Sequence, residues 1–297
     1  MSNLTRQIPA RFRRRCGKLL VATFLMTLPW PLMTDWEGGP AGSAADQPTY
    51  ALQQTDQSGQ AKAPASRIRP PEGTYRFPEH QTYFYSADWR MMSAGTASLR
   101  TQATGDSEHI ITKADTSGMV NLLFPVHDQF NATVNPRTFC SQGITKHTEE
   151  RSRRRDIELR FDYARRKSIF NEKNLKNGAV KHLENDIPEC VVDIMSGFYY
   201  VGSLRLNDGA VYVFPMNDGG QTNDITASVE AHERLKTGAG TFMTARVHVE
   251  PKAGALKSKG QAWVWYAVDV PHAPVQVRVR VRWGTLTFHL TRIERQS

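Results

Sequence analysis

Strict alternation of apolar and polar residues dominates the chain from about residue 75 to its end. In APVQVRVRVRW (273–283), the valines between positions 275 and 281 alternate with Gln276, Arg278, Arg280 and Arg282. A period of two places successive side chains on opposite faces of a strand. Similar runs recur about every 8–14 residues between polar turns, which is typical of an antiparallel meander.

Two segments depart from this period. SGMVNLLFPV (117–126) favours a short helix that ends near the proline. ECVVDIMSGFYYVGSLRL (189–206) places five apolar residues on one helical face, namely Val191, Ile194, Met195, Phe198 and Tyr199. We therefore expect a mainly β fold: a large curved antiparallel sheet or incomplete barrel, with one packing amphipathic helix that plugs its open side.

The N-terminal segment has the pattern of an export signal. A cationic stretch, RQIPARFRRRCGK, precedes the apolar run 19–33, and the small residues AGSAA follow at 41–45. The apolar run contains two prolines and is shorter than the about 20 residues of a membrane-spanning helix. We predict a signal peptide (1–45), a flexible linker (46–74) and a single β-rich domain (75–297). The location would be periplasmic or otherwise exported, with membrane association through this segment only if it stays uncleaved.

The charge of the chain limits its partners. The net charge is +9, but residues 1–45 hold six bases and two acids, so +5 remains on the rest of the chain. The main basic cluster, RSRRRDIELRFDYARRK (151–167), also alternates as a strand, with its aromatic residues on the apolar side. A nucleic-acid surface would interleave bases with exposed aromatic residues. Nucleic acid is therefore not an expected partner.

Two cysteines remain after signal cleavage, Cys140 and Cys190. An even pair in an oxidising compartment is a possible disulfide, which would close a loop of about 50 residues. The alternative is two buried free thiols on different strands, because spacing alone does not bring their Cα atoms together.

Arg278, Arg280 and Arg282 have two interpretations. They are the solvated side of a core strand, opposite acids supplied by VEAHE or TRIER on neighbouring strands. Alternatively, they form a surface for an anionic envelope partner such as a lipid head group.

Catalytic, metal-binding and cofactor-binding patterns are weak in this sequence. Ser196 in IMSGF lacks the preceding glycine of a nucleophile elbow. The nine histidines include no HxH or HExxH spacing, and no glycine-rich phosphate loop follows a strand. Asp193 and Glu233 are conceivable as an acid pair, although Asp193 suits a helix cap equally well. We expect no cofactor and no metal, and we lean against an enzyme.

The order of motifs in the C-terminal half resembles the exported domain of unknown function 3108 family. The opening strand pair, TYFYSADWRMMSAGTASL with Gly95 as hinge, is also similar, so the resemblance runs from about residue 78 to 293. The matching positions are Asp193, Ser196, Tyr199, Tyr200, Glu233, Thr237, Gly240, Phe242, Trp265, Asp269, Pro274, Val275 and Gly284. The resemblance implies a β-rich domain outside the cytoplasm, and it brings no activity and no catalytic residues.

Three functions fit these observations. The leading hypothesis is a non-enzymatic envelope protein that binds an apolar or lipid-like ligand in its curved sheet. The alternatives are an envelope scaffold and a hydrolase acting on envelope polymer. A binder predicts small residues or empty space where the helix meets the sheet, and a scaffold predicts dense packing there and an exposed apolar patch elsewhere. A hydrolase predicts titratable groups that converge in a cleft.

Overall fold

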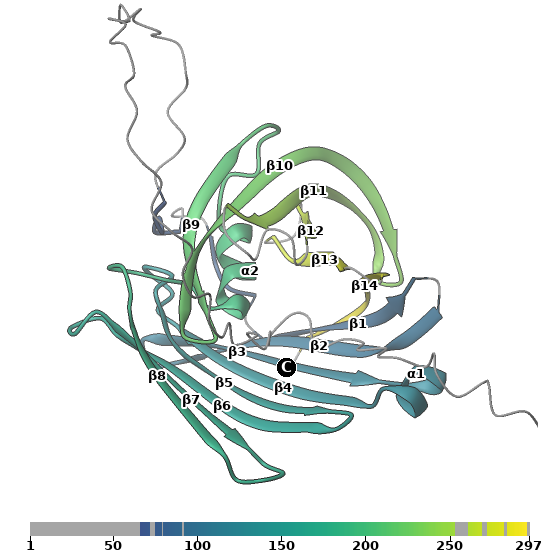
Figure 1. Cartoon of the computed structure of the whole chain (residues 1–297). Coiled ribbons are helices and arrows are strands. Elements are labelled where there is room, and N and C mark those ends of the chain that lie inside the picture. Colours follow the sequence, from purple (N-terminus) through teal and green to yellow (C-terminus); the bar gives the residue numbers. More distant parts are fainter. Residues whose placement is uncertain are drawn as a thin grey trace, which may run out of the picture.

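The protein folds as one continuous antiparallel sheet that curls around a helix (Figure 1). The computed structural model describes residues 66–71, 75–78, 80–90, 92–252, 261–268, 272–281 and 284–295. The predicted signal peptide (1–45) lies outside the described residues. Of the predicted linker only 66–71 is described, and it lies against the domain: Arg67 N donates to Val213 O (3.1 Å) and Arg69 N to the Tyr200 hydroxyl (3.1 Å).

The described part of the chain contains fourteen strands and two helices. The strands are β1 (Gln81–Trp89), β2 (Met92–Thr104), β3 (Ser107–Thr116), β4 (Val126–Val134), β5 (Ser141–Glu150), β6 (Arg153–Asp162), β7 (Lys167–Asn174), β8 (Val180–Asp186), β9 (Val211–Asp218), β10 (Gln221–Thr237), β11 (Gly240–Pro251), β12 (Gln261–Ala267), β13 (Pro274–Val281) and β14 (Gly284–Arg295). The helices are α1 (Gly118–Leu123) and α2 (Ile194–Gly202).

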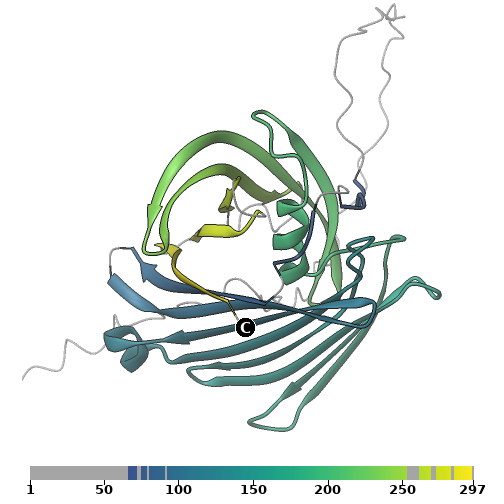
Figure 2. The same cartoon turned by 180° about the vertical axis from the view of Figure 1, so that it is seen from behind.

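The sheet is a meander whose first and last strands meet. Its order is β8-β7-β6-β5-β4-β3-β2-β1-β14-β13-β12-β11-β10-β9, so β1 pairs with β14 and the edges are β8 and β9. In both views β9–β14 curl tightly around α2, whereas β1–β8 form a broader, flatter half beneath them (Figures 1 and 2). The predicted fold class, a large curved antiparallel sheet with a packing helix, is confirmed.

The core lies on the concave face because alternation points one side of each strand inward. In β13, Val275, Val277 and Val279 are buried, while Arg278 and Arg280 are exposed. The helix α2 is enclosed more completely than its periodicity predicts, since Tyr200 and Val201 are buried as well as Met195 and Tyr199. The helix begins at Ile194, so Val191 packs from the segment before it.

The edge strand β9 is held against the concave face of the flatter half. Val192 and Met216 form a parallel bridge between the segment preceding α2 and β9. At the β9–β10 turn, the Gly220 carbonyl accepts bonds from Ser168 Oγ (3.2 Å) and Asn185 Nδ2 (2.9 Å). Gly220 has φ +80° and a Cβ there would lie 2.9 Å from Phe170 Cβ, so this contact requires glycine. These polar contacts close the open side of the sheet.

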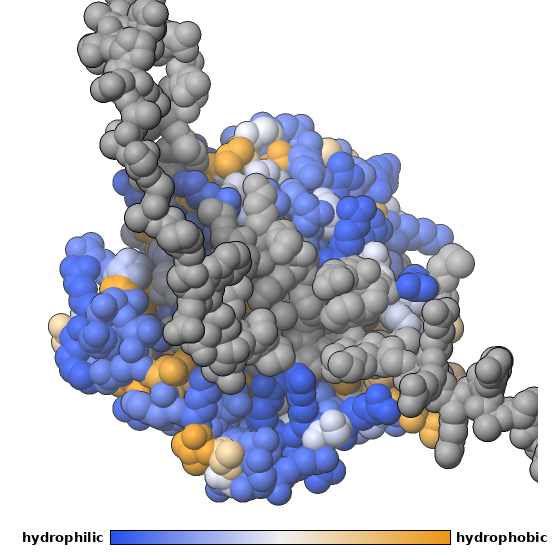
Figure 3. Space-filling model, in the orientation of Figure 1, coloured by the Kyte–Doolittle hydropathy of each residue, from blue (hydrophilic) through white to orange (hydrophobic). Residues whose placement is uncertain are grey.

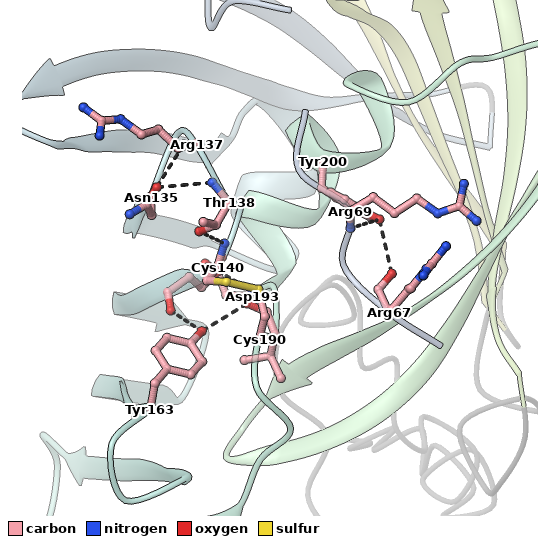
Figure 4. The surroundings of a disulfide bond; sticks show 12 residues. Arg67, Arg69, Asn135, Arg137, Thr138, Cys140, Tyr163, Cys190, Asp193 and Tyr200 are labelled. Atoms are coloured by element: carbon pink, nitrogen blue, oxygen red, sulfur yellow. Dashed lines mark hydrogen bonds between the residues drawn. A yellow bond between two sulfur atoms is a disulfide. The ribbon is translucent and has the colours of Figure 1, made fainter. Parts of the chain in front are cut away.

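A disulfide ties the loop after β4 to the segment before α2 (Figure 4). Cys140 and Cys190 are bonded, with their Cα atoms 5.1 Å apart. Beside the disulfide, the Tyr163 hydroxyl donates to the Ser141 carbonyl (2.6 Å). The cross-link therefore joins the flatter half directly to the start of the helix that the other half surrounds.

Candidate functional site

A pocket of about 160 Å³ lies on the concave face between the two halves of the sheet. Its walls come from β1–β4, β13 and β14, and α2 contributes Met195 and Phe198. The short helix α1 contributes Val120 at the end of the pocket where β3 finishes and β4 begins. The pocket therefore extends along the sheet from α1 towards α2.

Small side chains leave this space open. The strands β1 to β3 line it with Ala87, Ala94, Gly95, Ala97 and Ala114. Alternation turns Gly95 and Ala97 to the same face, and the register shift between β1 and β2 at Ala87 leaves Ala94 buried as well. Because these side chains are small, the curved sheet and the helix do not meet fully. A Cβ on Gly95 would lie 2.1 Å from the Asp115 carbonyl oxygen, which explains why β2 needs glycine beside β3.

Larger apolar groups complete the walls. Tyr85, Phe130, Phe288 and Leu286 line the pocket with the aliphatic residues of β13. The Tyr85 hydroxyl does not present a free polar group, because it donates to the Pro274 carbonyl (2.7 Å). A space with such walls is suited to an apolar molecule or an alkyl chain.

The α1 end of the pocket carries acids. Apart from Tyr85, the ionisable residues that line it are Asp115, Asp128 and Glu150, and the Asp115 carboxylate is half-exposed beside His127. Burial, and then the nearby Glu150 carboxylate, raise the pKa of Asp128 to about 7. The Glu149 backbone N–H donates to Asp128 Oδ1 (3.2 Å) and acts in the opposite direction. Perturbed carboxyl groups beside a cavity are common at binding and catalytic sites.

Glu150 also belongs to an ion pair on the concave face. Glu150 lies 3.6 Å from Arg155 Nη2, and Arg155 Nη1 lies 3.5 Å from Glu172. This ion pair continues away from the pocket along the concave face of β5–β7. The pocket end therefore favours an uncharged or positively charged group over a carboxylate or phosphate.

Asp128→Asn is expected to stabilise the protein at pH 8 and not at pH 4. Because the folded-state pKa lies above the unfolded value, wild-type stability falls as pH rises from about 4 to about 7. Asparagine removes this cost while keeping the acceptor for Glu149 N–H, and the gain above pH 7 should be about 2–4 kcal/mol. Urea unfolding at the two pH values measures it, with Glu158→Gln as control, since the Glu158 side chain is half-exposed and lies outside the pocket. If the variant and the wild type differed in unfolding free energy by the same amount at both pH values, the raised pKa of Asp128 would not be the cause.

The arginines of β13 have different neighbours from those expected. The guanidinium of Arg278 lies 5.1 Å from the centre of the Trp265 ring, and that of Arg280 lies 5.8 Å from the Trp263 ring. The neighbouring strand β12 thus supplies tryptophans for cation–π contacts, where we expected acids. Arg282 lies outside the described residues. An anionic partner for this surface stays a prediction.

Glu233 of β10 accepts bonds from side chains of β11 and β12. Arg246 Nη1 (3.0 Å) and Trp265 Nε1 (2.6 Å) both donate to Glu233 Oε1. Thr237 Oγ1 donates to the carbonyl of Gly240, whose φ of +137° suits the β10–β11 turn. These positions of the family pattern therefore build the sheet.

Asp193 and Ser196 form a buried structural group at the start of α2. Asp193 Oδ1 accepts the N–H groups of Met195 (2.8 Å) and Ser196 (3.1 Å), and its Oδ2 accepts the hydroxyls of Ser141 (2.7 Å) and Ser196 (2.5 Å). Burial raises the pKa of Asp193 while these four donors lower it. The side chains of Asp193 and Ser196 are both buried, and the Ser196 hydroxyl donates to Asp193, the N-cap of α2. Neither side chain is exposed enough to act as a catalytic group.

The remaining predicted positions add no chemistry to the pocket. The Tyr199 ring packs 5.4 Å from Phe77 in the core, and Asp269 lies outside the described residues. Within the described ranges, no three His, Cys, Asp or Glu side chains are grouped to hold a metal ion, and no helix is long and apolar enough to cross a membrane. Sequence reasoning named four lining residues for other reasons, namely Gly95, Met195, Phe198 and Pro274. It did not identify the rest of the lining, although the small residues of ADWRMMSAGTASL carried a signal.

Comparisons with known proteins support the fold and leave the activity open. A family profile, "Protein of unknown function (DUF3108)", matches residues 85–291. A solved beta-barrel-like protein of domain of unknown function DUF1849 from Brucella abortus is 6% identical, with a TM-score of 0.54 over 78% of this chain and 100% of that chain.

Two further solved structures resemble the chain more weakly. A protein from Bacteroides fragilis, described as exported with a YmcC-like fold, is 9% identical with a TM-score of 0.29. One from Parabacteroides distasonis, described as a lipoprotein, is 11% identical with a TM-score of 0.30. Both align over 78% of this chain and 100% of their own. The search of curated proteins returned no match.

Proposed function

The chain belongs to the DUF3108 family, and we propose that it is a non-enzymatic binder of an apolar or lipid-like ligand in the cell envelope. The observation that carries this proposal is the open pocket where the sheet and α2 meet, lined by Ala87, Ala94 and Ala97. Those are the features that distinguish a binder from a scaffold with a filled core.

The size and charge of the pocket define the ligand class. A volume of about 160 Å³ resembles the engineered cavity of about 150 Å³ that binds benzene, so the pocket accommodates one alkyl segment or a small ring. The acids at its α1 end, Asp128 and Glu150, disfavour a carboxylate there. The proposed ligand therefore carries a single inserted apolar segment with an uncharged or positively charged end.

Export to an oxidising compartment belongs to the same proposal. The N-terminal segment has the three-part pattern of a secretory signal, and Cys140 and Cys190 form the kind of disulfide that persists outside the cytoplasm. An envelope location would place the pocket beside lipids and lipoproteins. Mass spectrometry of the N-terminus of the exported protein tests the cleavage.

Ala97→Phe is expected to abolish ligand binding by filling the pocket. The matched control is Ala103→Phe, because Ala103 lies on the same strand with an exposed side chain outside the pocket. Each protein would be purified without detergent from its exporting host and extracted with organic solvent for mass spectrometry. We expect a stoichiometric apolar molecule from the wild type and from Ala103→Phe, and none from Ala97→Phe. A clean extract from folded wild-type protein would overturn the proposal.

Probes of equal chain length test the charge of the ligand separately. Dodecylamine and dodecanol should bind the delipidated protein more tightly than dodecanoate at pH 8. Equal binding of all three would reject the charge preference and leave the apolar site standing. Binding of none would reject the site.

A scaffold remains the second candidate because one apolar patch is exposed. Met119, Leu122 and Leu123 of α1 are 70%, 78% and 56% exposed. A clean extract together with a stable protein partner at this patch would favour the scaffold. The hydrolase alternative rests on the two acids Asp128 and Glu150 in the pocket, since Ser196 is buried and donates to Asp193.

A further inference from the structure

The helix α1 and the start of β2 expose four large apolar side chains, which we call the α1 rim. Its members are Met92, Met119, Leu122 and Leu123, with 53%, 70%, 78% and 56% of each side chain exposed. The backbone brings the start of α1 next to the start of β2, since Ser117 N donates to the Ala94 carbonyl (3.0 Å). In Figure 3 apolar residues are visible at the end of the molecule where Figure 1 places α1.

The α1 rim is continuous with the pocket. Val120 of α1 is 5% exposed and lines the pocket, while its neighbours Met119 and Leu122 point to solvent. Trp89, at the end of β1, also lines the pocket and is half-buried. A molecule that leaves the pocket at this end therefore meets an apolar surface. Contiguous exposed apolar groups of this kind mark interaction sites.

Basic side chains border the rim. The guanidinium of Arg151 lies 5.4 Å from the centre of the Phe124 ring, and Arg151 N donates to Pro125 O (2.8 Å) directly after α1. Arg90 lies 5.4 Å from the Trp89 ring. Arg154, at the start of β6, is 57% exposed.

The acids close to these arginines have cationic or histidine partners. Asp115 lies 2.9 Å from His127, and Glu149 lies 3.8 Å from Arg154. Asp88 lies 3.5 Å from His289. Arg151 therefore places a basic group beside the apolar side chains at the outer border of the rim, whereas Asp128 and Glu150 lie inside the pocket.

We propose that the α1 rim is a membrane-contact surface, which inserts into a bilayer rich in anionic lipids and holds the mouth of the pocket against it. Protein segments that bind at the membrane–water interface commonly combine exposed apolar side chains with Trp and basic residues at their border. Arginines near such a surface gain attraction to anionic lipids, each contributing independently of the apolar insertion. This inference goes beyond ligand binding, because the association of the α1 rim with vesicles can be measured whether or not the pocket holds a ligand.

Leu122→Asp is expected to reduce vesicle binding about tenfold or more, because it removes a leucine from the inserted surface and adds a repelled charge. The matched control is Val180→Asp, since Val180 is 70% exposed on the edge strand β8, away from α1. The exported protein would be sedimented with vesicles of phosphatidylcholine containing 30% phosphatidylglycerol. Thermal unfolding of each variant checks the fold.

Lipid charge gives the second readout. Arg151→Glu should weaken binding to the anionic vesicles several-fold and leave binding to pure phosphatidylcholine unchanged. Equal loss in Leu122→Asp and Val180→Asp would overturn the proposal. The proposal would also be overturned if the wild type bound vesicles and neither Leu122→Asp nor Arg151→Glu lowered that binding. The N-terminal segment would then hold the protein to the vesicles. A wild type that ignores vesicles but self-associates through Leu122 would make the rim a protein interface instead.

Discussion

Replacing Asp193 with alanine is expected to lower the free energy of unfolding by about 3–5 kcal/mol. The substitution removes the cap of α2 and leaves the hydroxyls of Ser141 and Ser196 buried without their acceptor. Loss of a cap costs about 1 kcal/mol, and each buried polar group that loses its partner costs about 1–3 kcal/mol. Because α2 forms one wall of the pocket through Met195 and Phe198, ligand binding should fall in parallel.

Asp193→Asn distinguishes the contribution of the backbone cap from that of the two hydroxyl hydrogen bonds. Its amide oxygen still accepts the N–H groups of Met195 and Ser196, but its amide nitrogen cannot accept from the two hydroxyls. We expect a smaller loss, about 1–2 kcal/mol, in urea unfolding at pH 7. If the alanine and asparagine variants were equally unstable, the backbone cap would not be the main contribution.

Removing the disulfide with Cys140→Ala and Cys190→Ala is expected to cost about 4 kcal/mol. The bond closes a loop with a sequence separation of 50 residues, and the chain-entropy argument gives this value for a loop of that length. The effect should be mostly on the unfolded state, because the loop joins two parts of the sheet that pack together in any case. Urea unfolding of the variant measures the loss.

Reduction of the wild type with dithiothreitol is the matched control for this variant. Both proteins lack the cross-link, so their unfolding midpoints should coincide. A reduced wild type that stays as stable as the oxidised protein would mean that the cross-link contributes little to the fold.

The candidate site was only partly predictable from sequence. The family pattern pointed to Asp193, Glu233 and Trp265, and the structure uses all three for packing and hydrogen bonding. The pocket instead depends on alanines in β1–β3 and on Asp128, which no motif distinguishes. A small residue in a strand leaves space only if its neighbours across the sheet and the helix above it do not fill that space. That condition involves residues far apart in the chain.

The arginines of β13 illustrate the same limit. Period two correctly predicted that Arg278 and Arg280 are exposed and that Val275, Val277 and Val279 are buried. It was wrong for Gln276, which it placed on the face of the arginines and which is buried beside Trp265 of β12. It did not identify the neighbours of the arginines, because register with β12 decides that Trp263 and Trp265 lie beside them. The acids that we expected there, in VEAHE, lie on β10, where Glu230 and Glu233 bind Arg246.

The sequence alone determined which segments are strands, which face of each is buried, and that a helix packs on the sheet. These properties follow from local alternation and from the 3.6-residue period, so each needs only a short window. The exception is β8, whose residues are mostly exposed and whose strand exists through backbone pairing with β7. Tertiary structure decided the rest: the pairing of β1 with β14, the contact of β9 with the flatter half, and the pocket between them. These features join residues up to about two hundred positions apart, and no local pattern records which strand closes against which.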